Sequence, residues 1–242
     1  MSFLAGKRVL ITGGTTGIGL AIARLLAVEG ASLLLIGRDG KDLNAALGEI
    51  ADLGGQAHGQ KADTARSDDV DQVFDAARRL LGGLDVLVCN AAVAADGIAE
   101  MRDKEWRYVL DVNIAGYLAC VRSAISMMQP QGSGAIVLIG SMSAEVREKG
   151  SSVYVATKGA IQAFAAALRK EVNESGIRVT LIEPGAVSTD MASGSPEDQR
   201  KAIAKEEMLL PEDIAACVRF VLGLPARCDV VTMQVRPHRQ LI

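Results

Sequence analysis

Short, unbroken runs of valine, isoleucine and leucine alternate along the chain with longer runs whose apolar residues recur at helical spacing. A short apolar run rich in β-branched residues is typical of a strand that is buried on both faces. Such runs predict strands at 8–11, 32–36, 56–61, 85–89, 135–139, 177–182 and 230–235, of which 56–61 is the weakest. The segments between them predict helices at about 17–29, 67–81, 103–128, 152–173 and 211–223, with one more helix after Asp39.

This alternation of strands and helices predicts the fold class. Continuous apolar strands separated by helices form a parallel sheet that is covered on both faces, and right-handed crossovers make that sheet doubly wound. We therefore expect an α/β fold with a Rossmann-like sheet of about seven strands and helices on both faces, in a single domain over 1–242. Asp39 and Ser67 are the expected N-caps of the helices that follow them.

One segment lacks a regular pattern. Residues 188–209 are polar, and Gly194, Ser195 and Pro196 interrupt them. Irregular segments of this length inside compact domains are often lids or binding loops. We expect a substrate-binding loop here, and the alternative is a disordered surface loop.

The bulk composition excludes several classes of partner. The 242 residues suit one α/β domain, with 49% hydrophobic and 23% charged residues. A formal net charge of −3 gives no attraction to nucleic acid or to an anionic membrane, and 3% aromatic residues leave no stacking platform for single strands. None of the apolar runs approaches the length of a membrane span.

The cysteines and histidines predict neither a metal site nor a disulfide framework. Cys89, Cys120, Cys217 and Cys228 are far apart, CxxC pairs do not occur, and the chain has 2 histidines. We expect the cysteines to be small buried hydrophobic residues in a reducing compartment. The N-terminal residues have no signal-peptide pattern, so the expected location is the cytoplasm.

A glycine-rich turn follows the first predicted strand, in the sequence Thr12-Gly13-Gly14-Thr15-Thr16-Gly17-Ile18-Gly19. Glycine admits positive φ and lets the backbone approach a ligand closely. The N-terminus of the following helix offers free N–H groups and a positive dipole end to a pyrophosphate. In a strand–turn–helix context at the start of a βαβ unit, the pattern indicates dinucleotide binding rather than a merely structural turn.

The end of the second predicted strand decides between the two nicotinamide dinucleotides. An acidic residue there would hold the ribose 2′-OH and repel a 2′-phosphate, but the sequence is Ile36-Gly37-Arg38. Arginine can bind a phosphate through two parallel hydrogen bonds, so we expect NADP(H) as the cofactor. Asp39 comes next, with the helix cap as its role. The alternative is an NAD-dependent enzyme in which Arg38 is a solvated loop charge.

Tyr154 and Lys158 are four residues apart near the start of a predicted helix, so they lie on one helical face. A free tyrosine has a pKa of about 10, which is too high for a proton shuttle at neutral pH. A nearby ammonium favours the phenolate, and a lowering by about two or three units needs roughly 3–4 kcal/mol. The pair predicts a general acid/base, and the alternative is a surface pair on a helix.

Ser141 and Asn113 give this pair its context. Ser141 follows the buried strand that ends at Ile139, so it lies at the carboxyl edge of the sheet, where open α/β folds bind ligands. Asn113 lies inside a predicted helix, where asparagine is not favoured. We expect its side chain to hold a backbone group or a water near the lysine, and the alternative is an exposed helix asparagine.

These motifs resemble, in type and order, those of the short-chain dehydrogenase/reductase family, and the resemblance to its short single-domain branch covers nearly the whole chain. The family pattern TGxxxGxG is matched by Thr12, Gly13, Gly17 and Gly19. The Asn-Ser-Tyr-Lys tetrad is matched by Asn113, Ser141, Tyr154 and Lys158. Further matches are Asp63-Thr64, the segment Cys89-Asn90-Ala91-Ala92 for NNAG, Pro184-Gly185, Val187 and Thr189.

The resemblance implies a role for each residue of the tetrad. Ser141 would hydrogen-bond the substrate oxygen, and Tyr154 would give or take a proton while hydride moves to or from the nicotinamide. Lys158 would hold the nicotinamide ribose and tune Tyr154, and Asn113 would keep a water that feeds protons through the lysine. The implied cofactor contacts are Gly13, Thr15, Thr16, Gly17, Ile18, Gly19, Arg38, Asp63, Thr64, Asn90, Ala91, Tyr154, Lys158, Pro184, Gly185, Val187 and Thr189.

One departure from the family pattern and two other functions bear on this reading. Cys89 and Ala92 replace an asparagine and a glycine of NNAG, and Ala92 adds a methyl group where the chain turns. An epimerase or dehydratase of nucleotide sugars also uses a tyrosine–lysine pair, but with TGxxGxxG spacing and a larger C-terminal lobe. A non-catalytic NADP-binding regulator is the other alternative, and the intact tetrad argues against it.

The implied reaction interconverts a carbonyl and a secondary alcohol on a small, mostly apolar substrate. The expected pocket is formed by the loop of the 190s with Ala94, Ser143, Ala144, Val146, Ser151 and Val187. Lysine and arginine are absent between Arg122 and Arg147, which argues against an acidic carrier protein as partner. The helix that carries Tyr154 is rich in alanine, and family members commonly pair through it. We expect a homotetramer or a dimer, and the alternative is a monomer.

Overall fold

The computed structural model describes residues 2–192 and 194–240. Its centre is a sheet of seven parallel strands, which are β1 Arg8–Thr12, β2 Ser32–Gly37, β3 Gln56–Lys61, β4 Val86–Cys89, β5 Gly134–Ile139, β6 Ile177–Pro184 and β7 Thr232–Val235. The spatial order is β3-β2-β1-β4-β5-β6-β7, so the winding reverses between β1 and β4. The predicted doubly wound, Rossmann-like sheet is confirmed.

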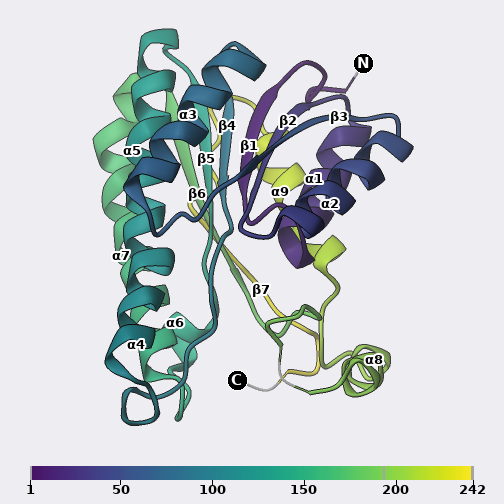
Figure 1. Ribbon diagram of the computed structural model, residues 1–242, viewed down its shortest axis with the longest axis vertical. Helices are drawn as coiled ribbons and strands as arrows, with labels where there is room; N and C mark the ends of the chain where they lie inside the picture. The colour runs from purple at the N-terminus through teal and green to yellow at the C-terminus, as the bar shows by residue number, and fades with distance from the viewer. Residues whose placement is uncertain (1, 193, 241–242) are drawn as a thin grey trace.

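Helices cover both faces of this sheet (Figure 1). One face carries α1 Gly17–Val28, α2 Gly40–Asp52 and α9 Pro211–Leu222, and the other carries α3 Ser67–Leu81, α5 Gly116–Met128 and α7 Ser152–Val172. Shorter helices, α4 Asp103–Leu110, α6 Ser143–Val146 and α8 Pro196–Ala204, lie toward the end of the sheet at which the strands end. Single 3-10 turns occupy Ile98–Glu100, Gln129–Gln131 and Asn173–Ser175.

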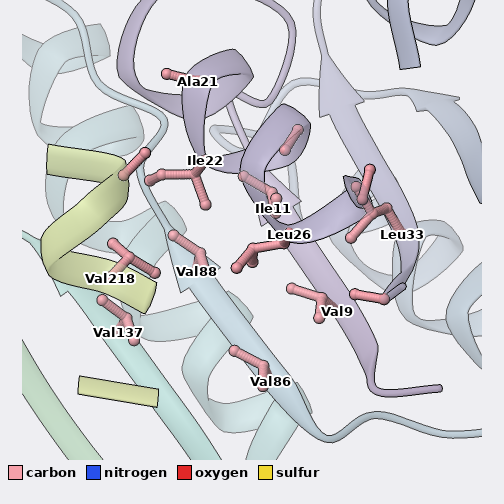
Figure 2. Packing of buried hydrophobic residues seen from close by; sticks show 14 of the residues in the cluster. Val9, Ile11, Ala21, Ile22, Leu26, Leu33, Val86, Val88, Val137 and Val218 are labelled. Atoms are coloured by element: carbon pink, nitrogen blue, oxygen red, sulfur yellow. The ribbon is translucent and has the colours of Figure 1, made fainter. Parts of the chain in front are cut away.

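Each face of the sheet has its own hydrophobic core, because successive side chains of a strand point to opposite sides. Val9 and Ile11 of β1 belong to one core together with Ile22 of α1 (Figure 2), whereas Leu10 belongs to the other core together with Phe74 of α3. The central strands are therefore buried on both faces. This is why their sequences are continuous apolar runs rather than alternating ones.

Two helix starts test the predicted caps. Asp39 is the N-cap of α2, and its carboxylate accepts hydrogen bonds from the backbone N–H groups of Lys41 at 2.7 Å and Asp42 at 3.1 Å. For α3 the expectation is wrong by one residue: Ser67 is the first helical residue, and Arg66 occupies the N-cap position without a side-chain bond. Acidic residues in the first turn of α3 interact with the helix dipole instead of a capping hydroxyl.

The expected irregular segment 188–209 contains a helix. Ser195 Oγ accepts from the Asp198 N–H at 3.2 Å, the Asp198 carboxylate accepts from the Ser195 N–H at 3.1 Å, and Pro196 takes the first helical position of α8. The residues that suggest an interruption are therefore a helix start signal. Residue 193 of this segment lies outside the described residues.

The helical run Asp103–Gln131 is long and apolar enough to meet the criteria for a membrane span, but 44% of its most apolar window is buried inside the fold. Its second half, α5, packs against α3 and β4. The cysteine expectation holds for Cys89 and Cys120, which are buried, but Cys217 is only partly buried and Cys228 is exposed. Cys228 lies near the end of the chain, between α9 and β7, where it packs in neither core.

Candidate active site

A cavity of about 760 Å³ runs along the carboxyl edge of the sheet. Its walls come from the segments that follow β1 to β6, as expected for a doubly wound fold. Most residues of the expected site line it, namely Gly13, Thr15, Thr16, Gly17, Ile18, Arg38, Thr64, Asn90, Ala91, Ser141, Tyr154, Lys158, Pro184, Gly185, Val187 and Thr189. The three others, Gly19, Asp63 and Asn113, are not among the lining residues.

The phosphate turn has a geometry that only glycine fits. Gly13 and Gly17 have φ of 62° and 50°, in the left-handed region. A Cβ on Gly19 would lie 2.0 Å from the carbonyl oxygen of Gly13, so this residue shapes the turn from behind. The turn leads into the N-terminus of α1, where the N-cap Thr16 makes no side-chain capping bond. Such a cradle of close backbone and free N–H groups fits a pyrophosphate.

The loop after β4 is tied to this turn. Thr12 Oγ1 accepts from the N–H groups of Asn90 and Ala91, both at 3.1 Å, and Asn90 Nδ2 donates to the Gly13 carbonyl at 2.9 Å. Ala92 is accommodated without strain, since in the described part of the chain the non-glycine residues with positive φ are Arg147 and Glu206. The sequence indicated Thr12 as a motif position but not this role in joining two loops.

Three side chains meet at Arg38, which lines the cavity. Arg38 Nη1 donates to the Tyr108 hydroxyl at 2.6 Å, and this hydroxyl donates to Asp63 Oδ2 at 2.8 Å. The other carboxylate oxygen of Asp63 accepts from the Ala65 N–H at 3.0 Å, which holds the carboxylate in place. Through Tyr108, Asp63 is therefore linked to Arg38, which lines the cavity. Sequence reasoning missed Tyr108, because an amphipathic helix supplies no signal that marks one polar position among several.

Tyr154 and Lys158 project from α7 toward the cavity, and both line it. Ser141 lines the same cavity, and its hydroxyl lowers the pKa of the Tyr154 phenol. Lys158 is buried, with its Nζ 5.6 Å from the centre of the Tyr154 ring. The ammonium donates to the Ile139 carbonyl oxygen at 3.0 Å. The buried Tyr117 donates to the same carbonyl at 3.0 Å and was another residue that the sequence did not reveal.

The electrostatics of the pair differ from the sequence-based expectation. Burial raises the pKa of Tyr154 to about 12, although the hydrogen bond with Ser141 lowers it and the charge of Glu148 raises it further. Burial lowers the pKa of Lys158 to about 8. The ammonium of Lys158 alone does not lower the pKa of Tyr154, because it bonds to a backbone carbonyl and desolvation of the phenol dominates. A protonated phenol at neutral pH can serve as a proton donor.

Asn113 holds a backbone group, one of the two roles expected for it. It lies in a π turn, Asp111–Ala115, which separates α4 from α5 in the run expected to be one helix. Its Oδ1 accepts from the Val93 N–H at 2.8 Å, and its Nδ2 donates to the Val93 carbonyl at 2.9 Å and to Thr157 Oγ1 at 3.3 Å. Asn113 is 1% exposed, which excludes the surface alternative. Such π turns occur frequently at functional sites.

The substrate end of the cavity contains part of the expected pocket. Ala94, Ser143, Ser151 and Val187 line it as expected, together with Met191 and Met208, but Ala144 and Val146 do not. Two carboxylates, Glu148 and Asp190, also line it. Arg147 ends α6 with φ of 58°, and Ser143 Oγ donates to Glu148 Oε1 at 3.0 Å. The lining of the whole cavity is mainly apolar, as expected of the pocket, and its rim also carries negative charge.

The parallel sheet, the glycine cradle and the tyrosine beside a buried lysine together define a Rossmann-like dinucleotide-dependent oxidoreductase. The family model for short chain dehydrogenases matches residues 7–200. The chain belongs to the short-chain dehydrogenase/reductase family.

Relatives and solved structures agree with this assignment. An uncharacterized oxidoreductase of Staphylococcus aureus is 34% identical over 239 residues, which are 98% of this chain and 100% of that protein. A dehydrogenase/reductase from Sinorhizobium meliloti has a TM-score of 0.87 at 33% identity, covering 96% of this chain and 94% of its own. A short chain dehydrogenase from Burkholderia cenocepacia, solved in complex with NADP, has a TM-score of 0.87 at 32% identity, covering 97% and 98%.

Proposed function

We propose that this protein is an NADP(H)-dependent oxidoreductase that interconverts a carbonyl and a secondary alcohol on a small molecule, with Tyr154 as the general acid/base. One observation carries the proposal: Ser141 and Tyr154, with a buried lysine beside the phenol, line the same cavity as the phosphate turn and Arg38. The acid/base group Tyr154, the ammonium of Lys158 and the phosphate turn thus line one cavity.

The choice of NADP(H) rests on the segment after β2. Arg38 is exposed at the cavity wall, where a 2′-phosphate would need a cation. The adjacent carboxylate of Asp39 is engaged as the cap of α2, which leaves Arg38 as the phosphate-binding side chain. The related dehydrogenase from Burkholderia cenocepacia was solved with NADP, which supports this choice. When bound, NADP(H) supplies or accepts the hydride.

The residues of this chain supply the proton and the orientation. In the reductive direction, Ser141 donates a hydrogen bond to the substrate oxygen, and Tyr154 gives its proton to that oxygen. The Lys158 ammonium lies near the resulting phenolate and stabilises its charge. Asn113 fixes Val93, and through Thr157 it also contacts the helix turn that carries Lys158. In the oxidative direction Tyr154 must first lose its proton, so that direction is favoured at higher pH.

We further propose a cytoplasmic homo-oligomer, a tetramer or a dimer, with no nucleic-acid or membrane partner. Four alanines of α7 are exposed, Ala156, Ala163, Ala166 and Ala167, and small side chains allow a second helix to approach closely. Sedimentation velocity tests this part, and a monomer at micromolar concentration would rule it out.

The test of the catalytic proposal is a panel of small ketones and secondary alcohols assayed with NADPH and NADH side by side. Tyr154→Phe should lower kcat by about 10²–10⁴-fold while the Kd for NADPH changes by less than about twofold. Circular dichroism and melting temperature confirm that the variant is folded. A clear preference for NADH would overturn the cofactor assignment, and an undiminished rate in Tyr154→Phe would overturn the mechanism.

A further inference from the structure

We propose that Tyr108 determines specificity for NADP(H) by acting as a spacer, which keeps the Arg38 guanidinium at the cavity wall and prevents it from pairing with Asp63. This inference rests on the proposed preference for NADP(H). Tyr108 belongs to α4, whereas Arg38 follows β2 and Asp63 follows β3, so the three residues join separate elements.

The hydroxyl of Tyr108 lies between two opposite charges. It accepts from Arg38 Nη1 at 2.6 Å and donates to Asp63 Oδ2 at 2.8 Å. The guanidinium carbon is 5.8 Å from the centre of the Tyr108 ring, so the cation also lies beside the aromatic face. Both functions of a phenol, donor and acceptor, are used. A phenylalanine would leave the ring in place and remove only this bridge.

Without the bridge, Arg38 has a competing partner. An arginine and a carboxylate attract strongly and favour a bidentate pair, which engages two of the guanidinium N–H groups. Within the described residues Arg38 forms no salt bridge, although Asp63 is one hydroxyl away. Tyr108 uses a single N–H of the guanidinium, so its remaining donors are available for phosphate oxygens.

The phenol itself is suited to this role. Tyr108 is half-buried, and its pKa is raised, mainly by burial and by the hydrogen bond to Asp63, while the bond from Arg38 lowers it. It therefore stays neutral at physiological pH and can donate and accept at once. Its position is set by α4, one turn before the π turn that holds Val112 at the cavity wall. Asp63 is anchored by Ala65, so the spacer has a fixed support.

The experiment is a thermodynamic cycle on cofactor binding, measured by isothermal titration calorimetry with NADPH and NADH. Tyr108→Phe should raise the Kd for NADPH by about five- to tenfold and change the Kd for NADH by less than about twofold. The reason is that only NADPH carries the phosphate that Arg38 binds. In an Arg38→Ala background, Tyr108→Phe should no longer change the ratio of the Kd for NADPH to the Kd for NADH, which we call the NADPH/NADH ratio. Tyr108 then has no guanidinium left to position.

A rescue variant separates spacing from general damage. If loss of the spacer lets Asp63 capture Arg38, then adding Asp63→Asn to Tyr108→Phe should restore the NADPH/NADH ratio to within about twofold of the wild type. Arg107→Ala is the matched control, because it removes the neighbouring cation of α4, which pairs with Asp103 at the surface. It should leave the ratio unchanged.

The outcomes distinguish this inference from the proposed function. If Arg38→Ala leaves the NADPH/NADH ratio unchanged, the assignment of Arg38 as the phosphate ligand fails, and the spacer fails with it. If Arg38→Ala shifts the ratio but Tyr108→Phe does not, the spacer alone is overturned. Failure of Asp63→Asn to rescue, or a loss in Arg107→Ala equal to that in Tyr108→Phe, also overturns it.

Discussion

The floor of the cavity and its rim are held together by different kinds of contact. We call the residues at the strand ends, 12–19, 90–93, 113, 139–141 and 154–158, the floor, and 143–151 with 188–209 the rim. Floor side chains such as Asn113 and Lys158 are buried and bond to backbone atoms. On the rim, side chains that are less buried bond to each other, as the half-buried Ser143 does to the exposed Glu148.

Because of this difference, we expect the floor to hold the proton-transfer geometry and the rim to determine substrate selectivity. Backbone partners of the floor are fixed by the sheet, so the proton-transfer geometry is inherited from the fold. The segments of the rim do not belong to the sheet, so their side chains can be exchanged without disturbing either core. We therefore expect floor substitutions to have larger and less selective effects than rim substitutions.

After Tyr154→Phe, the largest effect is expected from Lys158→Met at the floor. Loss of the ammonium near the phenolate should lower kcat by about 10²–10³-fold. The same substitution should stabilise the cofactor-free protein, because burial of the charged lysine without an acidic partner is unfavourable, as its lowered pKa of about 8 indicates. Urea unfolding at several pH values, together with steady-state kinetics, measures both effects.

The pH dependence of this stabilisation has a definite sign. Between about pH 8 and the ordinary value of 10.5, the unfolded chain holds a proton on Lys158 that the folded chain has lost, so wild-type stability rises across this window. The advantage of methionine should thus be greatest below pH 8, at most about 3 kcal/mol, and shrink toward pH 10.5. A methionine variant that is less stable at pH 7 would contradict this account of the floor.

A smaller but still severe effect is expected from Gly19→Ala. Its Cβ would lie 2.0 Å from a backbone oxygen of Gly13, so the phosphate turn must shift. NADPH and NADH should both bind about ten- to a hundredfold more weakly in calorimetric titration, because the turn contacts what the two share. The matched control is Gly48→Ala in α2, where a Cβ meets nothing within 4 Å. That control should gain up to about 1 kcal/mol of stability, and equal losses in both variants would argue against a specific turn geometry.

The floor is also the region that the sequence predicts well. Ser141, Tyr154, Lys158 and the glycines follow strand ends, and strand ends are marked by apolar runs that the doubly wound fold brings to one edge. Periodicity and motif spacing therefore suffice to place these residues at one cavity. The π turn at Asn113 was not predicted, because it changes the backbone without changing the helical pattern of apolar residues.

The rim was predicted poorly, for a physical reason. Most of its residues are exposed or only partly buried, so hydrophobic periodicity carries little information about them. The helix α8 is recognised only by the local chemistry of Ser195, Pro196 and Asp198. Glu148 reaches the cavity through the left-handed backbone of Arg147, a conformation that a non-glycine sequence does not announce. Tyr108 and the pKa of Tyr154 depend on contacts between distant segments.

A moderate and selective effect is expected from Glu148→Gln at the rim. The carboxylate lines the substrate end, so it repels anionic substrates. With two aryl methyl ketones that differ only in a carboxylate or a neutral group, kcat/KM for the anionic ketone should rise about two- to fivefold relative to the neutral one, and the gain should shrink in high salt. Because Glu148 raises the pKa of Tyr154, the rise of alcohol oxidation with pH should also move to lower pH.

Glu145→Gln is the control for this charge effect. Glu145 is an exposed carboxylate of α6 that bonds to Gln162 and does not line the cavity. It should leave the ratio of the two ketones unchanged. An equal shift of this kcat/KM ratio in both variants would indicate that the net charge of the surface acts, rather than a carboxylate at the cavity. The proposed difference between rim and floor would then be contradicted.

The smallest effect is expected from Gln199→Ala in α8. Gln199 accepts from Ser188 Oγ at 2.7 Å and donates to the Thr189 carbonyl at 3.3 Å, so it ties α8 to the segment that follows β6. Thr189 lines the cavity beside Gly17. Loss of these two hydrogen bonds should weaken the binding of NADPH and of NADH equally, by about two- to threefold, and should leave kcat nearly unchanged.

Lys201→Ala is the matched control in the same helix, because Lys201 pairs with Glu197 at the surface and does not line the cavity. It should leave the Kd for NADPH and for NADH unchanged, since an exposed ion pair of this kind contributes little. The decisive result is the size of the loss in Gln199→Ala relative to Gly19→Ala. If the rim substitution weakens cofactor binding as much as the floor substitution does, then α8 is part of the rigid cofactor-binding turn. In that case the floor does not hold the catalytic geometry independently of the rim.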